Sequence, residues 1–312
     1  MTAIPRQVWL PQQFADFAGL PAGLHYTRWD GVSAFPTDPA AVEFYVPPLV
    51  QDIGVISKPL TDMTRLRVVQ ALSSGTDELR SELERLPRHI TLCSARGVNA
   101  GSTAELALTL ILSSLRGIPE FVRAQGDGVW RPAVRASLDG QHVVLVGYGA
   151  IGSAVEDLLT PFRCRVTRVA RTDRATPRGP VHSVQRLADL VTQADVVVVA
   201  TPLTPDTRGL IDATVLARMK NGALLVNVSR GAVVDTAALV EEARSGRLRV
   251  AVDVTDPDPL PEGHPLWSVP DVLITPHVGA FTHSLWPRLE ELIRAQLARF
   301  AAGEELVNVV AR

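Results

Sequence analysis

Short apolar runs alternate with amphipathic stretches along most of the chain, and they predict strands that alternate with helices. The clearest run is His142–Val146, whose β-branched residues are typical of a buried parallel strand. Later strands are predicted at Arg165–Ala170, Asp195–Ala200, Ala223–Val228, Arg249–Val254 and Asp271–Thr275, with helices at Ser153–Leu159, Thr214–Met219 and Thr236–Ser245. This order predicts an α/β fold with a doubly wound parallel sheet of about six strands.

The N-terminal part of the chain repeats this alternation with shorter elements. Strands are predicted at Gln7–Leu10, Ala41–Val46, Leu66–Ala71 and Ile90–Cys93, with helices near Asp62–Leu66 and Asp77–Leu86. This βαβ pattern predicts a second, smaller parallel sheet.

Two longer helices complete the predicted elements. Thr103–Arg116 is apolar on nearly every side, which predicts a deeply buried helix, and the polar segment Gln125–Gln141 separates it from the strand at His142. The last helix is predicted at Leu285–Ala302 and ends at Gly303. The tail that follows, Leu306–Val310, is a candidate for one more strand.

Chain length and composition narrow the class of protein. At 312 residues the chain exceeds the size at which single cores stop growing, roughly 250–300 residues, so we expect about two domains. Its 46% hydrophobic and 21% charged residues are ordinary for a soluble globular protein. The formal net charge of −2 provides no basic field, so we expect neither nucleic acid nor a membrane surface as a partner.

The cysteines, the histidines and the N-terminus add further expectations. Cys93 and Cys164 are too few for a disulfide framework, and their apolar neighbours predict buried thiols. The seven histidines form no cluster with zinc-ligand spacing, so we expect no metal site. The N-terminus has no signal-like apolar region, and no apolar run approaches the roughly 18 residues that span a membrane. We therefore expect a cytoplasmic protein.

Three glycines follow the strand at His142–Val146 with the spacing G-x-G-x-x-G. Gly147, Gly149 and Gly152 stand where the predicted strand turns into a helix. In that setting they serve a tight turn, close approach of a pyrophosphate to the backbone, and close packing of helix on strand. The helix N-terminus then offers N–H groups to the phosphates. The spacing alone is also found in plain strand–helix turns, but its setting favours dinucleotide binding.

Polar side chains also follow the later strands of the predicted sheet. Because ligands of open parallel sheets bind at the carboxyl ends of the strands, these side chains are candidates for a site. Arg230, Asp258 and His277 each have an ordinary explanation, as a surface cation, a turn residue and a loop histidine. Their joint arrival at one sheet edge beside a dinucleotide site favours a catalytic role.

Several motifs in the same order make the chain similar to the D-isomer-specific 2-hydroxyacid dehydrogenases. They are Leu72–Asp77, Gly147–Gly152, Thr201–Leu210, Asn227–Asp235, Asp253–Pro259 and Thr275–Gly279. The resemblance implies a flavodoxin-like substrate domain formed by residues 1–97 and 283–312, with a Rossmann dinucleotide domain inserted at 98–282. It also implies a catalytic cleft between the two and a homodimer formed through the dinucleotide domains.

The resemblance further assigns roles to individual residues. Arg230 would clamp the substrate carboxylate together with the backbone amides of Ser74 and Gly75, because its planar fork suits a carboxylate. His277 would exchange a proton with the substrate oxygen, and Asp258 would orient its ring. Asp253 would hold the nicotinamide carboxamide. Other cofactor contacts fall on Gly147, Tyr148, Gly149, Ala150, Ile151, Gly152, Thr201, Pro202, Thr207, Val228, His277 and Gly279.

Asp258 departs from the family pattern, in which glutamate is usual. Aspartate is one methylene shorter, so it reaches the imidazole only if its loop has adjusted, and placement errors of about 1 Å can cost about 10²-fold in rate. Asp256 is an alternative partner for the ring.

The residues after the second strand of the large sheet bear on the choice of cofactor. NAD enzymes place an acidic residue there for the ribose 2′-hydroxyl. Here the strand ends in Ala170, followed by Arg171, Thr172 and Arg174, which suit a 2′-phosphate and predict NADP(H). The alternative is NAD(H), with Asp173 on the ribose and incidental arginines in a surface turn.

The expected substrate is a small 2-keto acid, such as glyoxylate or hydroxypyruvate, in exchange with its D-2-hydroxy acid. Ala280 stands where the family has glycine, and Phe281 and Trp286 either form a bulky wall near the cleft or pack with the last helix. The alternative function is a corepressor-like or sensor protein that binds dinucleotide with little or no dehydrogenase activity.

Overall fold

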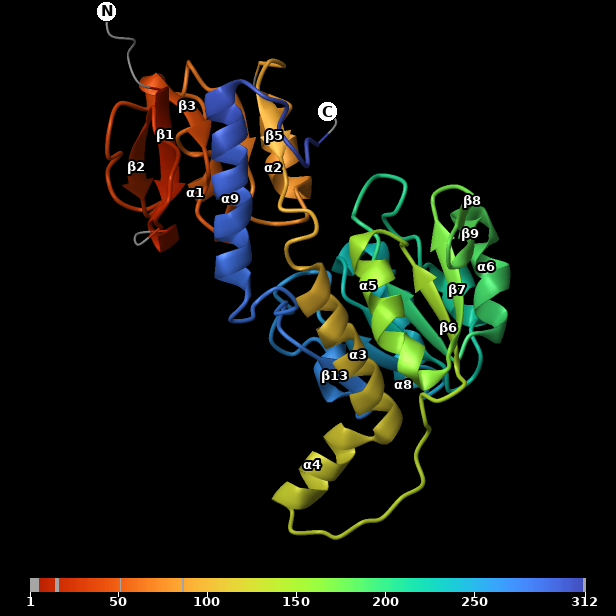
Figure 1. The fold of residues 1–312 in the computed structure, drawn as a ribbon. Coiled ribbons are helices and arrows are strands. Elements are labelled where there is room, and N and C mark those ends of the chain that lie inside the picture. Colours follow the sequence, from red (N-terminus) through yellow and green to blue (C-terminus); the bar gives the residue numbers. More distant parts are fainter. Residues whose placement is uncertain (1–5, 15–16, 51, 86, 311–312) are drawn as a thin grey trace, which may run out of the picture. The chain divides into compact units, whose positions relative to one another are not determined.

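The computed structural model describes residues 6–14, 17–50, 52–85 and 87–310 and contains two separate sheets (Figure 1). The chain divides into two compact units. The first unit comprises Met1–Asn99 and His283–Arg312, and the second comprises Ala100–Thr282. The second unit thus starts two residues later than the predicted range 98–282. Two mainly parallel sheets with helices confirm the predicted α/β fold class.

The sheet of the first unit has five parallel strands in the order β2-β1-β3-β4-β5. They are β1 (Arg6–Pro11), β2 (Leu24–Trp29), β3 (Val42–Tyr45), β4 (Val68–Gln70) and β5 (Thr91–Cys93). This is the strand order of flavodoxin-like sheets. Strand β2 was not predicted, because it lies at the sheet edge and Trp29 is its one buried residue.

In the described part of the first unit, this sheet is accompanied by the α-helices α1 (Ile53–Ser57), α2 (Asp77–Leu83) and α9 (Leu285–Ala302). The fully buried Leu289, Ile293 and Leu297 of α9 pack in one apolar cluster with Val8 and Phe44 of the sheet. Helix α9 therefore covers one face of the sheet. Its bounds are those predicted from the sequence.

Two predicted elements of the first unit are wrong. Leu60, Met63 and Leu66 are buried at helical spacing, but Asp62–Leu66 forms successive turns, closed by bonds such as Leu66 N to Met63 O (3.0 Å). The C-terminal tail forms a single antiparallel bridge between Val309 and Cys93 rather than a strand. Asn308, with φ 55°, interrupts the extended backbone that a strand requires.

The sheet of the second unit has eight strands in the order β13-β12-β11-β10-β6-β7-β9-β8. They are β6 (His142–Val146), β7 (Arg165–Ala170), β8 (Arg174–Thr176), β9 (Gly179–Ser183), β10 (Val196–Val199), β11 (Leu224–Asn227), β12 (Arg249–Val252) and β13 (Val272–Ile274). All neighbours are parallel except β8 and β9. The prediction of about six strands missed β8 and β9, because this hairpin carries no apolar run.

Helices bury both faces of this sheet. Val143 and Leu145 point to the face covered by α3 (Ala100–Arg116) and α5 (Ala150–Leu159). Val144 and Val146 point to the opposite face, with α6 (Leu187–Leu190), α7 (Ala213–Arg218) and α8 (Thr236–Arg244). Burial on both faces explains why the strands read as continuous valine-rich runs.

Other helices depart from the predicted positions. Helix α4 (Ile118–Gly126) was not predicted, and α3 and α5 each begin three residues before their predicted starts. Short 3-10 helices lie at Gln12–Phe14, Pro39–Ala41, Thr160–Phe162, Val184–Arg186, Val191–Gln193, Gly231–Val233 and Pro265–Ser268. Within the described ranges, no helix is both long enough and apolar enough to cross a membrane.

His142 opens the central strand β6 as a buried neutral group. Its Nδ1 lies 2.9 Å from the Gln193 carbonyl oxygen and its Nε2 lies 2.9 Å from the Thr167 hydroxyl. One donor and one acceptor satisfy a neutral imidazole. Burial disfavours the charged ring and lowers the pKa of His142 below its usual value, with the neighbouring Arg165 acting in the same direction.

We expect His142 to make the protein less stable in acid. The imidazole returns to a pKa of about 6.5 on unfolding, so the unfolded state binds more protons. The contribution of His142 to the free energy of unfolding is therefore fully present above about pH 6.5. It is lost as the pH falls from about 6.5 toward the lower pKa of the folded state. Denaturant unfolding across this range should show a smaller loss for His142→Gln than for the wild type. The exposed His89, changed to Gln, serves as the control, and equal losses in all three proteins would contradict this role.

Candidate active site

The glycine turn after β6 brings two strands of the second unit into backbone contact. Gly147 has φ 100°, and a Cβ there would lie 2.6 Å from the Ala200 carbonyl at the end of β10. A Cβ on Gly152 would lie 2.1 Å from the Gly147 carbonyl oxygen. A Cβ on Gly149 would meet nothing within 4 Å. The first and third glycines are therefore required by the turn itself, whereas the second leaves the backbone open to a ligand.

This turn lies where a dinucleotide is expected to bind. Strands β6 and β10 are neighbours, and the chain order reverses between them, which makes their carboxyl ends the switch point of the sheet. Helix α5 begins directly at Ala150, and its N-cap residue Gly149 makes no side-chain capping bond. The first N–H groups of the helix are thus directed at this edge, and the arrangement fits a pyrophosphate.

The residues predicted to bind a 2′-phosphate lie beside this turn. Arg171, Thr172 and Arg174 are exposed, and Arg174 Nη2 donates to the Tyr148 carbonyl oxygen at 2.6 Å. Among the described residues, neither Arg171 nor Arg174 has a carboxylate partner. Asp173, the alternative ligand for a ribose, accepts a bond from the Ser183 backbone N–H at 3.0 Å and so closes the β8–β9 hairpin.

The predicted contacts after β10 form a tight loop. The Thr207 hydroxyl donates to the Pro202 carbonyl oxygen at 2.6 Å and accepts from the Thr204 N–H at 2.8 Å. The Val228 N–H donates to the Val199 carbonyl oxygen at 3.1 Å, which ties the end of β11 to β10. Thr201, Pro202, Thr207 and Val228 thus follow strands β10 and β11, and their contacts with a cofactor stay predictions.

Arg230 is presented by a turn that Asn227 holds. The buried Asn227 Oδ1 accepts from the Ser229 N–H at 3.0 Å, and Asn227 Nδ2 donates to the Arg230 carbonyl oxygen at 2.9 Å. A Cβ on Gly231 would lie 1.9 Å from the Thr255 carbonyl, so the turns after β11 and β12 touch. Asn227 was given no role from the sequence, although a polar residue that ends a buried strand is a usable signal.

Asp253 holds the backbone that carries His277. Its carboxylate, 3% exposed, accepts from the Thr275 hydroxyl (2.6 Å) and from the N–H groups of Val278 and Gly279 (both 2.9 Å). His277 has φ 55°, a left-handed conformation that costs non-glycine residues free energy, and its N–H donates to the Asp253 carbonyl oxygen at 2.8 Å. Three of about four acceptor positions of this carboxylate are thus used within the protein. Its predicted bond to a carboxamide remains a prediction.

His277 and Asp258 form a side-chain pair. His277 Nδ1 lies 2.7 Å from Asp258 Oδ2, and both side chains are about one-third exposed. The shorter aspartate therefore reaches the imidazole, and Asp258 rather than the alternative Asp256 makes this bond. With Nδ1 donating to Asp258, Nε2 is the nitrogen that can exchange a proton with a substrate.

Two other predictions concern the first unit. The Ser74 hydroxyl donates to Asn99 Oδ1 at 2.6 Å, and the Gly75 carbonyl oxygen accepts from the Ser73 hydroxyl at 2.6 Å. Both residues follow β4, and their binding of a carboxylate stays a prediction. Trp286 packs edge-on against Phe14 with ring centroids 5.9 Å apart. This contact agrees with the alternative in which Trp286 packs with the last helix.

Residues 108–279, more than half of the chain, match the family described as "D-isomer specific 2-hydroxyacid dehydrogenase, NAD binding domain". The chain belongs to this family. A glyoxylate reductase/hydroxypyruvate reductase of Mus musculus is 34% identical over 263 residues, which cover 80% of this chain and 79% of the mouse protein.

Further relatives extend the match. A glyoxylate reductase of Aeropyrum pernix is 33% identical over 266 residues, which cover 81% of this chain and 78% of that protein. A solved structure of a D-isomer specific 2-hydroxyacid dehydrogenase from Xanthobacter autotrophicus Py2, in complex with NADPH and MES, has a TM-score of 0.83 at 29% identity. That likeness covers 99% of this chain and 98% of the other. The protein is therefore an NAD(P)-dependent 2-hydroxyacid dehydrogenase, and these names favour an enzyme over a corepressor-like protein.

We expect Asp258 to act on the reaction through His277. Asp258→Asn removes the acceptor that fixes the ring and its tautomer, so kcat/KM should fall by about 10²-fold and its pH dependence should change. Asp258→Glu, which restores the residue usual in the family, should retain more activity.

The neighbouring Asp256→Asn is the matched control and should stay within about twofold of the wild type. An unchanged pH–rate profile in Asp258→Ala would disprove the role. A profile altered by Asp256→Asn instead would move the role to Asp256.

Proposed function

We propose that this enzyme reduces a small 2-keto acid, of the glyoxylate and hydroxypyruvate class, with NADPH as the preferred hydride donor. The observation that carries the cofactor preference is the pair Arg171 and Arg174, exposed beside the glycine turn with no carboxylate partner among the described residues. Strand β7 ends in Ala170 rather than in an acidic residue, and the two guanidinium groups that follow would attract a 2′-phosphate.

Two observations support the cofactor preference. Asp173 already accepts the Ser183 N–H at 3.0 Å, so one oxygen of its carboxylate is committed to the hairpin. The Xanthobacter relative was solved with NADPH. The size of the substrate is supported by the relatives from Mus musculus and Aeropyrum pernix, which are named as glyoxylate or hydroxypyruvate reductases.

The residues of the second unit divide the reaction between them. The glycine turn and the start of α5 would hold the dinucleotide, which supplies the hydride when bound. Arg230 binds the carboxylate of the 2-keto acid and polarises the neighbouring carbonyl. His277 Nε2 gives a proton to the carbonyl oxygen, and Asp258 keeps the ring oriented. In the reverse direction, Nε2 accepts the hydroxyl proton.

We also propose a homodimer formed through α4 and the segment that follows it. Ile118, Val122, Val129, Trp130 and Val134 are 46%, 59%, 44%, 95% and 100% exposed. In Figure 1, α4 and the long loop after it extend away from the sheet of the second unit. The cation–π contact of Arg135 with Phe121, 5.6 Å, folds this loop back onto α4. Such a group of exposed apolar side chains fits a second copy of the same surface.

The cofactor preference is tested by steady-state assays with NADPH and NADH. The substrates are glyoxylate, hydroxypyruvate, pyruvate and longer or aromatic 2-keto acids. We expect a higher kcat/KM with NADPH, and highest turnover with glyoxylate or hydroxypyruvate. The double variant R171A/R174A should lose on the order of 10²-fold in kcat/KM for NADPH and little for NADH, because charge-assisted bonds to the 2′-phosphate are removed.

The exposed Arg244 of α8, changed to Ala, is the matched control and should leave both values unchanged. A higher kcat/KM with NADH in the wild type would overturn the cofactor proposal. NADPH binding without reduction of any keto acid would overturn the substrate proposal.

The dimer is tested by light scattering. We expect a molar mass of twice that of one chain, and a shift toward the monomer in V122D/W130D, because burying two carboxylates in an apolar interface is costly. Leu158→Asp, at a partly exposed leucine on α5, should keep the wild-type mass. A monomeric wild type would refute this interface.

A further inference from the structure

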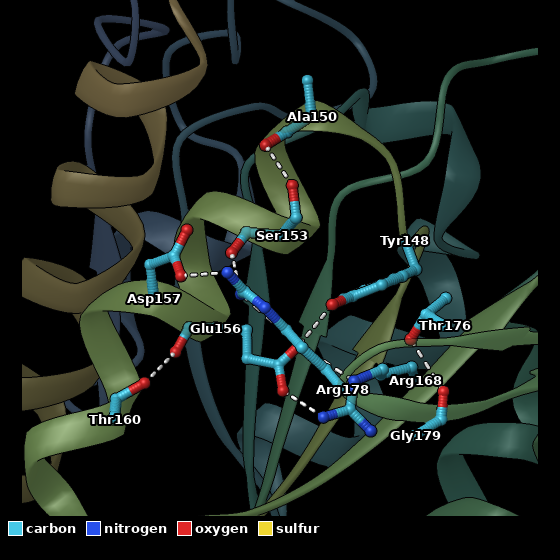
Figure 2. Close-up of polar contacts among 10 residues, drawn as sticks. All are labelled: Tyr148, Ala150, Ser153, Glu156, Asp157, Thr160, Arg168, Thr176, Arg178 and Gly179. Atoms are coloured by element: carbon cyan, nitrogen blue, oxygen red, sulfur yellow. Dashed lines mark hydrogen bonds and ion pairs between the residues drawn. The ribbon is translucent and has the colours of Figure 1, made fainter.

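Tyr148, inside the glycine turn, is tied to a buried ion pair. Figure 2 shows its side chain directed toward α5 and β7. The Tyr148 hydroxyl donates to Glu156 Oε2 at 2.5 Å, and Arg168 Nε donates to the same oxygen at 2.9 Å, while Arg168 Nη2 bonds the other carboxylate oxygen. Glu156 is 8% exposed and Arg168 is 9% exposed. The middle residue of the turn is thus anchored to both the helix and the strand that flank it.

The β8–β9 hairpin holds the same region from outside. Arg178 pairs with Asp157, donates to the Ser153 carbonyl oxygen at 3.3 Å, and lies 3.9 Å from Glu156 (Figure 2). Arg174 donates to the Tyr148 carbonyl oxygen at 2.6 Å. Tyr148 is therefore held at its hydroxyl by Glu156 and at its carbonyl by Arg174.

The charges in this network determine which arginines can meet a phosphate. Burial raises the pKa of Glu156, but hydrogen bonds from Arg168 and Tyr148 outweigh this effect and leave its pKa below the usual value. The ionised Glu156 neutralises Arg168, and Asp157 neutralises Arg178. Arg174 donates one of its five N–H groups to a backbone oxygen, and among the residues that the structure describes the others remain available to a ligand.

We propose that Tyr148, Glu156 and Arg168 form a positioning device that sets Arg174 against the 2′-phosphate of the dinucleotide. The inference rests on the proposed preference for NADPH. The contacts run from Arg168 to Glu156, from Glu156 to the Tyr148 hydroxyl, and from the Tyr148 carbonyl to Arg174. A turn whose tyrosine loses its hydroxyl bond holds its carbonyl, and hence Arg174, less firmly. The N–H groups that would meet the 5′-phosphate belong to the start of α5, from Ala150 onward, and not to the Tyr148 carbonyl that Arg174 contacts.

The test compares two probes that differ only in the 2′-phosphate: adenosine 2′,5′-bisphosphate and 5′-AMP. Removing Glu156 or Arg168 would leave a buried charge unpaired and threaten folding, so Tyr148→Phe is the informative variant. By titration calorimetry without substrate, we expect Tyr148→Phe to weaken binding of the bisphosphate about 10-fold and that of 5′-AMP less than about twofold. The KM for NADPH should rise more than the KM for NADH.

Tyr26→Phe is the matched control, because the Tyr26 hydroxyl also donates a single bond, to the Pro21 carbonyl oxygen at 2.7 Å in the first unit. It should change neither affinity. If the wild type binds the bisphosphate more tightly and Tyr148→Phe weakens both probes equally, or neither, the positioning role is wrong while the cofactor preference stands. A wild type that binds both probes equally overturns the cofactor preference itself, and the inference with it.

Discussion

The candidate site depends on backbone contact between strand ends in the second unit. Side chains would keep these ends apart: a Cβ at Gly147 or Gly231 would lie 2.6 or 1.9 Å from the backbone of the neighbouring turn. A Cβ at Gly152 would lie 2.1 Å from the Gly147 carbonyl oxygen, within the glycine turn itself. Close packing of this kind leaves no room for even one methyl group. Gly147 joins β6 to β10 and Gly231 joins the turns after β11 and β12. The turns carrying Arg230, Asp253 and Asp258 are therefore parts of one packed edge.

Hydrogen bonds from buried polar residues then fix the turns that these contacts bring together. Asn227 holds the Arg230 turn, and Asp253 holds the His277 turn in a conformation that the histidine would not favour alone. Neither residue needs to touch a substrate to influence the proposed reaction, because each fixes the backbone that carries Arg230 or His277. The proposed chemistry thus depends on two buried polar residues, Asn227 and Asp253, that lie behind the side chains expected to meet the substrate.

The sequence predicted the parallel strands well because valine-rich runs buried on both faces have few other interpretations. It missed the β8–β9 hairpin, whose residues such as Arg174 and Pro180 carry no apolar periodicity. It misplaced a helix at Asp62–Leu66, where buried residues recur at helical spacing but the backbone forms turns. The periodicity of apolar residues predicts which residues are buried, but it does not determine the backbone conformation between them.

The site could be predicted only in part for a related reason. Glycine spacing and polar strand ends indicated Arg230, Asp258 and His277, while their roles came from the family resemblance. The bond between Glu156 and Arg168 joins a helix to a strand, and no local pattern marks it. Gly149 carries a different kind of information. The protein's own packing would accept a side chain at Gly149. Selection for stability alone would therefore preserve Gly147 and Gly152 but would allow other residues in place of Gly149. A glycine at this position is explained by the ligand rather than by the fold.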